Sequence, residues 1–129
     1  MNAARQMWQE IAPLFGLADL VPDPDGMIRL RLGGDGLLQL EGVGDGLLMG
    51  MARPCGAQTA PLLALAACDA RRTPLPVRAG LRVAGHGCGT DLLVLVLRFS
   101  AAQCSLPAVA RGLDLLLDLH GRIATGGGA

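Results

Sequence analysis

The chain contains few side chains that could carry out acid–base or metal chemistry. Its two histidines are His86 and His120, and its four cysteines are Cys55, Cys68, Cys88 and Cys104. His86 and Cys88 are two residues apart, and Cys55 or Cys68 could join them as ligands. However, structural zinc needs four nitrogen or sulfur ligands in recognisable pairs, and the chain has no CxxC and no second histidine at ligand spacing. We therefore expect no bound metal.

Catalytic groups are equally scarce. His120 lies in a leucine-rich segment near the expected end of a helix, where a cation complements the helix dipole. Asp114 and Asp118 are one helical turn apart and are expected on the solvated side of that helix, opposite the leucines. Residues 42–46 resemble a phosphate-binding loop, but they lead into a strand, whereas phosphate binding needs a helix N-terminus there. The sequence therefore predicts neither an enzyme nor a cofactor.

Composition narrows the class of protein. With 129 residues, of which 51% are hydrophobic and 17% charged, the chain can bury one core and is not disordered. Its formal net charge is zero and no basic stripe is visible, which argues against nucleic-acid binding. The longest aliphatic run, residues 92–97, is far shorter than the roughly 20 residues of a membrane span. The N-terminus lacks the apolar centre of a signal peptide, so we expect a cytoplasmic protein with free thiols.

The N-terminal half predicts one helix and three strands. Apolar residues recur at helical spacing over residues 3–16, and Gly16 is a plausible stop. Residues 27–32 alternate in polarity, as a half-buried strand does. Two further strands begin at repeated Gly-Asp-Gly-Leu-Leu phrases, residues 34–38 and 44–48, and Asp-Gly between alternating segments is a strong hairpin signal. We expect an antiparallel meander.

The C-terminal half predicts a helix over residues 58–71, strands over 79–86 and 90–99, and a last helix over 105–123. Residues 92–97 are apolar on both faces, so their strand should be central or lie in a subunit interface. The predicted fold is α+β in the order α-β-β-β-α-β-β-α, with a twisted antiparallel sheet flanked by helices. Residues 1–124 would form a single domain, and 125–129 a flexible Gly-rich tail.

The order of elements and their local sequences resemble the class I type III secretion chaperones, which hold effectors before export. The resemblance spans residues 5–123 and is strongest from Thr90 through the apolar strand and the loop ending Ser105-Leu106-Pro107 into the leucine-rich final helix. The first helix, ending Leu14-Phe15-Gly16-Leu17, is also similar to the start of that family. The chain departs from the family in charge, because it is neutral where these chaperones are usually acidic.

The resemblance implies a cytoplasmic homodimer that binds the N-terminal region of a secreted effector in an extended state, without ATP, and leaves docking on the secretion apparatus open. It implies that the effector segment fills apolar patches on the first helix and the meander and adds a strand to a sheet edge. The implied partner-binding residues are Trp8, Ile11, Phe15, Leu30, Leu38, Leu40, Met49 and Met51. The implied dimer-interface residues are Leu62, Leu63, Val83, Leu93 and Leu95.

A different class of function fits the same sequence. A small α+β domain that binds a small molecule or serves as a scaffold would use the same elements. It predicts a closed cavity and stability without a protein partner, whereas a chaperone predicts open apolar grooves on a dimer. Any of the Leu and Met positions named above could also simply fill the core beneath the helices.

Overall fold

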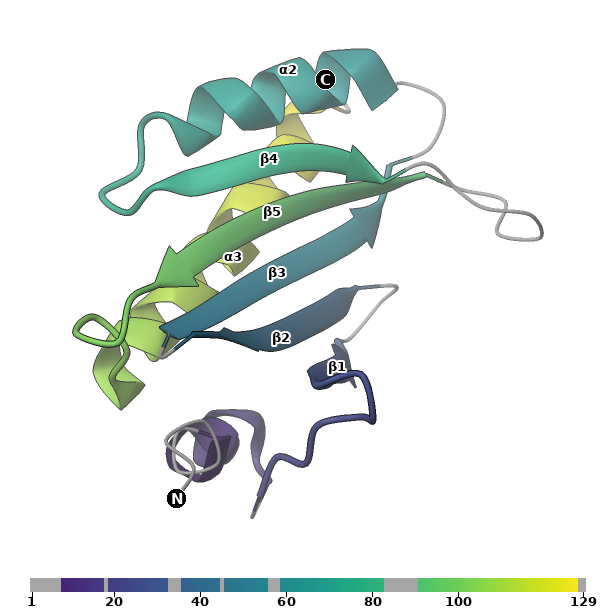
Figure 1. The fold of residues 1–129 in the computed structure, drawn as a ribbon. Helices are drawn as coiled ribbons and strands as arrows, with labels where there is room; N and C mark the ends of the chain where they lie inside the picture. Colours follow the sequence, from purple (N-terminus) through teal and green to yellow (C-terminus); the bar gives the residue numbers. More distant parts are fainter. Residues whose placement is uncertain are drawn as a thin grey trace.

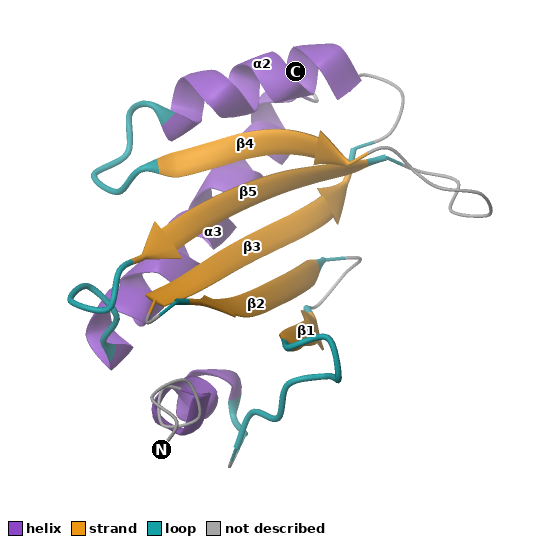
Figure 2. Cartoon of the chain, viewed as in Figure 1, coloured by secondary structure: helices purple, strands orange, loops and turns teal. Residues whose placement is uncertain are grey.

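A computed structural model describes residues 8–17, 19–32, 36–44, 46–55, 59–82 and 91–127. Helices and strands follow one another in the predicted α-β-β-β-α-β-β-α order (Figures 1 and 2). After a first helical segment that ends in the 3-10 helix η1, the elements are β1 (Met27–Arg31), β2 (Leu37–Val43), β3 (Gly46–Pro54), α2 (Thr59–Ala70), β4 (Val77–Arg82), β5 (Leu92–Phe99) and α3 (Leu106–Gly127).

The five strands form one antiparallel sheet in the order β1-β2-β3-β5-β4. The first three strands are the predicted meander, and Gly44 in the β2–β3 turn has the positive φ of 59° that favours glycine. Strand β5 lies between β3 and β4, which agrees with the first of the two predicted alternatives, an interior position in the sheet.

Helix α3 crosses one face of the sheet, behind the strands in Figure 1, while α2 runs beside β4. The core lies between α3 and the sheet, and the inward residues alternate along each strand, as the pleat requires. Its fully buried side chains include Leu40, Met49, Met51, Leu95, Leu97, Val109, Leu116 and Leu119. Leu117 is 38% exposed, because the buried stripe of α3 passes through Val109, Leu116 and Leu119.

Helix α3 approaches the sheet closely at Gly112. A Cβ atom at this position would lie 2.6 Å from Phe99 Cζ, 3.0 Å from Leu97 Cδ1 and 3.2 Å from the methyl carbon of Met49. All three neighbours are buried, so none has open space into which it could withdraw. The absence of a side chain at Gly112 therefore lets the helix rest directly on the sheet.

The first helical segment is shorter in α form than predicted. Residues 8–11 are α-helical, and the chain then tightens into η1 (Ala12–Phe15). Pro13 explains the change, because proline lacks the N–H that an α-helix needs and its ring crowds the preceding turn. Gly16 ends the segment in the left-handed conformation, with φ of 71°, as its position in the sequence indicates. Residues 3–7 of the predicted helix lie outside the described residues.

Other boundaries differ by a few residues. Strand β4 begins at Val77, two residues before its prediction, directly after Pro76. Helix α3 continues to Gly127, so it takes in residues 125–127, the start of the predicted tail. Its N-terminus is as expected, since the Ser105 hydroxyl accepts a hydrogen bond from the Ala108 N–H at 3.2 Å. None of the described helices combines the length and the apolar character needed to cross a membrane.

Candidate partner-binding surfaces

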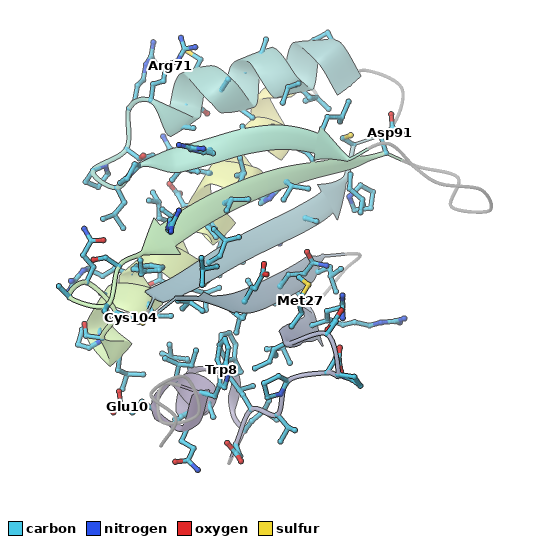
Figure 3. The ribbon with its side chains drawn as sticks, in the orientation of Figure 1. Trp8, Glu10, Met27, Arg71, Asp91 and Cys104 are labelled. Atoms are coloured by element: carbon cyan, nitrogen blue, oxygen red, sulfur yellow. The ribbon has the colours of Figure 1, made fainter. Side chains whose placement is uncertain are left out.

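The predicted partner-binding residues form a continuous apolar region, but most of it lies inside the chain. Trp8 extends from the first helical segment toward the sheet (Figure 3) and is 3% exposed. Phe15 and Leu30 are half-buried and pack against the core from its edge. The remaining predicted contacts, which are also buried, are Ile11, Leu38, Leu40, Met49 and Met51. In this conformation a partner could reach only Phe15 and Leu30 among the eight.

The structure exposes two further apolar residues in the chain segment that follows Phe15. Leu17 and Val21, in the connection from η1 to β1, are 42% and 77% exposed. We call Phe15, Leu17, Val21 and Leu30 the N-terminal apolar surface. Helical spacing could not identify Leu17 and Val21, because they follow the residue that ends the helix. The sequence signal for an exposed apolar site was the presence of two large aliphatic residues in a predicted loop.

Ion pairs fix the turn from which β1 starts. The Arg29 guanidinium contacts the carboxylates of Asp23 at 2.8 Å and Asp25 at 2.7 Å. The hydrogen bond from Arg29, followed by one from the Met27 N–H, lowers the pKa of the Asp25 carboxyl. These charged groups occupy the polar face of β1, so they hold the edge strand without covering Leu30 on its other face.

No described element covers the face of the sheet opposite α3, which is turned toward the viewer in Figure 1. The strand register places Leu37, Ala52, Val94 and Gly80 in one row across this open face. Gly50, in the next row, is paired with Val96 and presents no side chain. The row through Val94 is thus apolar across β2, β3 and β5, whereas Arg78 and Arg98 lie in the following rows of the same face.

The predicted dimer-interface residues divide between the two faces. Leu93 and Leu95 point toward α3 and are buried in the core of the same chain. Leu62 and Leu63 are half-buried on α2. Val83 lies outside the described residues. The alternate residues of β5, Val94 and Val96, are the ones on the open face. Period-two alternation places these two residues together on one face, but it does not tell which face meets α3.

His120 differs from its predicted role. It is 3% exposed, lies seven residues before the last residue of α3, and its Nε2 atom is 2.8 Å from the carbonyl oxygen of Met51 on β3. Burial lowers the pKa of the His120 imidazole, and the nearby Arg53 guanidinium acts in the same direction. The side chain therefore links the helix to the sheet and does not complement the dipole at a helix end.

The remaining candidate chemistry is dispersed. Burial raises the pKa of the Cys55 and Cys104 thiols, and Cys55 and Cys68 are free cysteines. Asp114 and Asp118 are exposed on α3, where Asp118 pairs with Arg122. Within the described ranges no three histidine, cysteine or acidic residues gather as metal ligands would. His86 and Cys88 lie outside those ranges.

Comparison with known proteins gives structural matches alone. No family model matches the chain, and no curated protein matches it in sequence. A chain of the ExsC–ExsE complex matches with a TM-score of 0.65 and 23% identity, covering 89% of this chain and 86% of its own. A chain of the HopA1–SchA chaperone–effector complex matches with a TM-score of 0.66 and 18% identity, covering 92% and 91%.

A third match is to the crystal structure of the Yersinia pestis type III secretion chaperone SycH in complex with a stable fragment of YscM2. Its TM-score is 0.61 at 16% identity, and the match covers 94% of this chain and 97% of the other. The three matches cover 89–94% of this chain. The chain therefore has the fold of the matched chains in these three complexes.

Proposed function

We propose that the protein is a cytoplasmic type III secretion chaperone that binds the N-terminal segment of a secreted effector in an extended, secretion-competent state. The observation that carries this proposal is the shared fold, which covers 89–94% of this chain in the three matches. Two of these structures are described as containing chaperones, and one of them as a chaperone–effector complex. Binding, and not catalysis, is the proposed activity.

The N-terminal apolar surface supports the proposal. Phe15, Leu17, Val21 and Leu30 leave apolar area in contact with water beside β1, which is an edge strand of the sheet. An edge strand offers unpaired backbone N–H and C=O groups, and an extended peptide can pair with them. An effector segment would place aliphatic side chains on the apolar surface while its backbone continued the sheet.

We further propose that the protein is a homodimer that associates through the open face near the start of β5 and through α2. Leu37, Ala52 and Val94 are neighbours in register, and the two glycines at positions 50 and 80 leave room for a partner's side chains. Leu62 and Leu63 provide half-buried apolar area on α2. Leu93 and Leu95 would support this interface from the core without touching the partner.

Capture from the native bacterium tests the function. The tagged chain should retain one secreted protein in cell lysates, and mass spectrometry should identify it. Limited proteolysis of the pair should leave a protected fragment from that protein's N-terminal region, and a version lacking this region should not be captured. A stable chain that retains a small molecule and no protein would favour the ligand-binding alternative and contradict the chaperone proposal.

A further inference from the structure

A groove lies around the end of β5, where the strand meets the loop that leads to α3. One cavity of about 340 Å³ opens on the α3 side of the strand and another of about 350 Å³ on the open face. Pro76, Arg98 and Gln103 line both cavities. We call the combined depression the Arg98 groove. It shares no residue with the N-terminal apolar surface.

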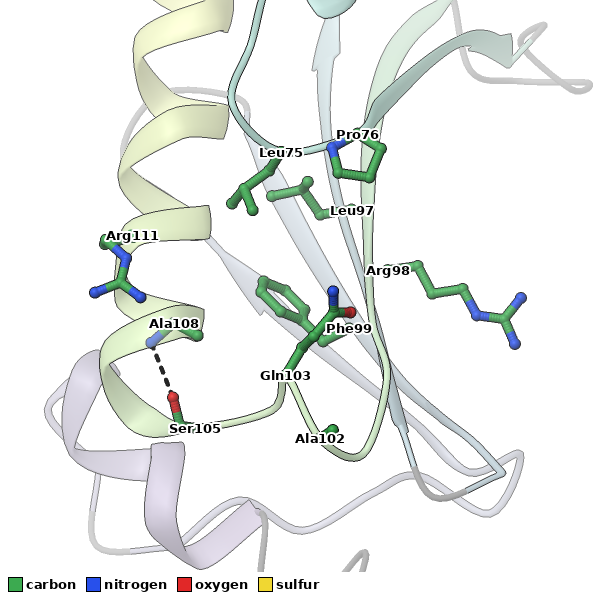
Figure 4. A pocket seen from close by; sticks show the side chains of 10 residues that line it. All are labelled: Leu75, Pro76, Leu97, Arg98, Phe99, Ala102, Gln103, Ser105, Ala108 and Arg111. Carbon is green, nitrogen blue, oxygen red and sulfur yellow. Dashed lines mark hydrogen bonds between the residues drawn. The ribbon is translucent and has the colours of Figure 1, made fainter.

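The charged side chains of the Arg98 groove are all arginines. Arg78 and Arg98 line it on the open face, and Arg111 lines it on the other side, with Arg98 and Arg111 on opposite sides in Figure 4. All three residues are exposed, and none of their guanidinium groups has an ion pair or hydrogen bond within the described part of the chain. Arg29 and Arg122, by contrast, are both paired with aspartates.

The neutral polar side chains of the groove use their acceptor atoms within the chain, so their N–H and O–H groups can donate to a ligand. Gln103 accepts a hydrogen bond from the Ser100 N–H at 3.0 Å through Oε1, which leaves its NH₂ group available. The Ser105 hydroxyl accepts from the Ala108 N–H, shown as a dashed line in Figure 4, which leaves its own proton to donate. A groove that offers guanidinium, amide and hydroxyl donors suits a ligand rich in acceptors.

The floor of the groove is apolar. Leu97 and Phe99 are buried there, and Leu75 and Ala108 are half-buried beside them. A volume of about 340 Å³ lies at the lower end of the range for ligand pockets and can accept one or two large aliphatic or aromatic side chains. The ligand must therefore combine negative charge with an apolar group.

We propose that the Arg98 groove binds an acidic peptide segment of a partner protein, with a bulky apolar side chain of that segment seated over Leu97 and Phe99. Carboxylates of the segment would pair with Arg78, Arg98 and Arg111, whose planar guanidinium groups match carboxylates in bidentate geometry. A nucleic acid suits the groove less well, because the chain is neutral overall and the groove exposes no aromatic ring on which bases could stack. The proposal does not depend on the effector-binding function.

Fluorescence anisotropy with three labelled peptides tests the ligand chemistry on the intact protein. The first peptide carries Leu-Phe between runs of Glu, the second replaces Glu with Gln, and the third replaces Leu-Phe with Ser-Ser. The first should bind, and each of the others should bind about tenfold more weakly or worse. Added NaCl should weaken binding of the first peptide, because salt screens exposed ion pairs. Failure of the first peptide to bind, or equal binding of all three, would overturn the proposal.

Protein variants locate the site. Arg98→Gln combined with Arg111→Gln should weaken the acidic peptide about tenfold, since two ion pairs are lost. Arg31→Gln, which changes an exposed arginine of β1, should leave binding unchanged. Circular dichroism should match the wild type for both proteins, because these side chains are exposed. Equal loss with Arg31→Gln, or displacement of the peptide by duplex DNA at lower concentration than by unlabelled peptide, would contradict a peptide site in this groove.

Discussion

His120 on α3 and Met51 on β3 are joined by a hydrogen bond of 2.8 Å between the Nε2 atom and the carbonyl oxygen, across 69 residues of sequence. A carbonyl oxygen only accepts, so Nε2 carries the proton and a neutral imidazole satisfies the contact. The bond lies beneath α3, beside Arg53, whose charge opposes a second proton on the ring. It ties the longest helix to a central strand through a group that can titrate.

This geometry predicts that stability falls as the pH falls below the ordinary imidazole value. Burial lowers the pKa of His120 in the folded chain from 6.5, so the unfolded chain binds the proton more readily. The stabilisation is complete above pH 6.5 and is lost as the pH falls through the folded-state value. Urea unfolding at a series of pH values between neutral and mildly acidic should show the free energy of unfolding decreasing toward acid.

His120→Leu is the variant that isolates this effect. It removes the titrating group, so the decrease toward acid should become much smaller, while the lost hydrogen bond should cost about 1 kcal/mol at neutral pH. His86→Ala removes the other histidine and should keep the wild-type pH dependence. An unchanged pH profile in His120→Leu would assign the effect to carboxylates instead.

Gly112 and Gly121 form a matched pair on α3. Gly112→Ala places a methyl group 2.6 Å from Phe99 Cζ, and overpacking of this kind costs about 1–3 kcal/mol, which outweighs the roughly 1 kcal/mol that alanine gains in a helix. With an overpacking cost near the middle of that range, we expect a net loss of about 1 kcal/mol. At Gly121 no atom of the described residues beyond the local helix backbone lies within 4 Å of the added Cβ, so Gly121→Ala should stabilise by up to about 1 kcal/mol. Thermal unfolding of both variants checks the opposite signs.

The order of elements was predictable because each local pattern agrees with its neighbours. Alternation over residues 27–32, the two Gly-Asp-Gly phrases and Pro61 near the start of α2 each mark an element that the structure contains. The 3-10 geometry of η1 was harder to predict from the sequence. Its change to 3-10 geometry depends on how Pro13 competes with the preceding α-helical turn, and periodicity alone does not resolve that competition.

It was harder to predict from the sequence which face of its strand each apolar residue occupies. A strand such as β5 is apolar on both faces, so its alternation does not tell which face meets α3. The burial of Leu93 and Leu95 shows that they face the helix, and this depends on contacts with α3, which begins eleven residues after Leu95. The same limit applies to Met49 and Met51, whose flexible side chains suit a core as well as a binding surface.

The proposed dimer predicts a specific change in mass. The wild-type protein should sediment at twice 13.3 kDa at low micromolar concentration. Val94→Asp introduces a charge at the centre of the open face, where burying it in an interface is costly, so the variant should sediment as a monomer with an unchanged fold. Leu117→Asp, on the exposed side of α3, should remain a dimer. A monomeric wild type, or a dimeric Val94→Asp, would contradict the proposed interface.

The N-terminal apolar surface predicts how partner binding responds to charge and to salt. Phe15→Glu and Val21→Glu each place a carboxylate where an effector side chain would be buried, and a seated aliphatic group contributes about 1–3 kcal/mol. Captured effector should therefore fall about tenfold or more for each variant. Binding by the wild type should change little between low and high NaCl, because apolar contacts are not screened as ion pairs are.

Burial supplies the controls for this experiment. Trp8→Glu and Met49→Glu change residues that are almost completely buried, so both variants should lose their folded circular dichroism signal as well as binding. Phe15→Glu and Val21→Glu should keep the wild-type signal, because Phe15 is half-buried and Val21 is exposed. If effector capture survives both surface substitutions but disappears in high salt, the effector is recognised by charge, and the N-terminal apolar surface is not its binding site.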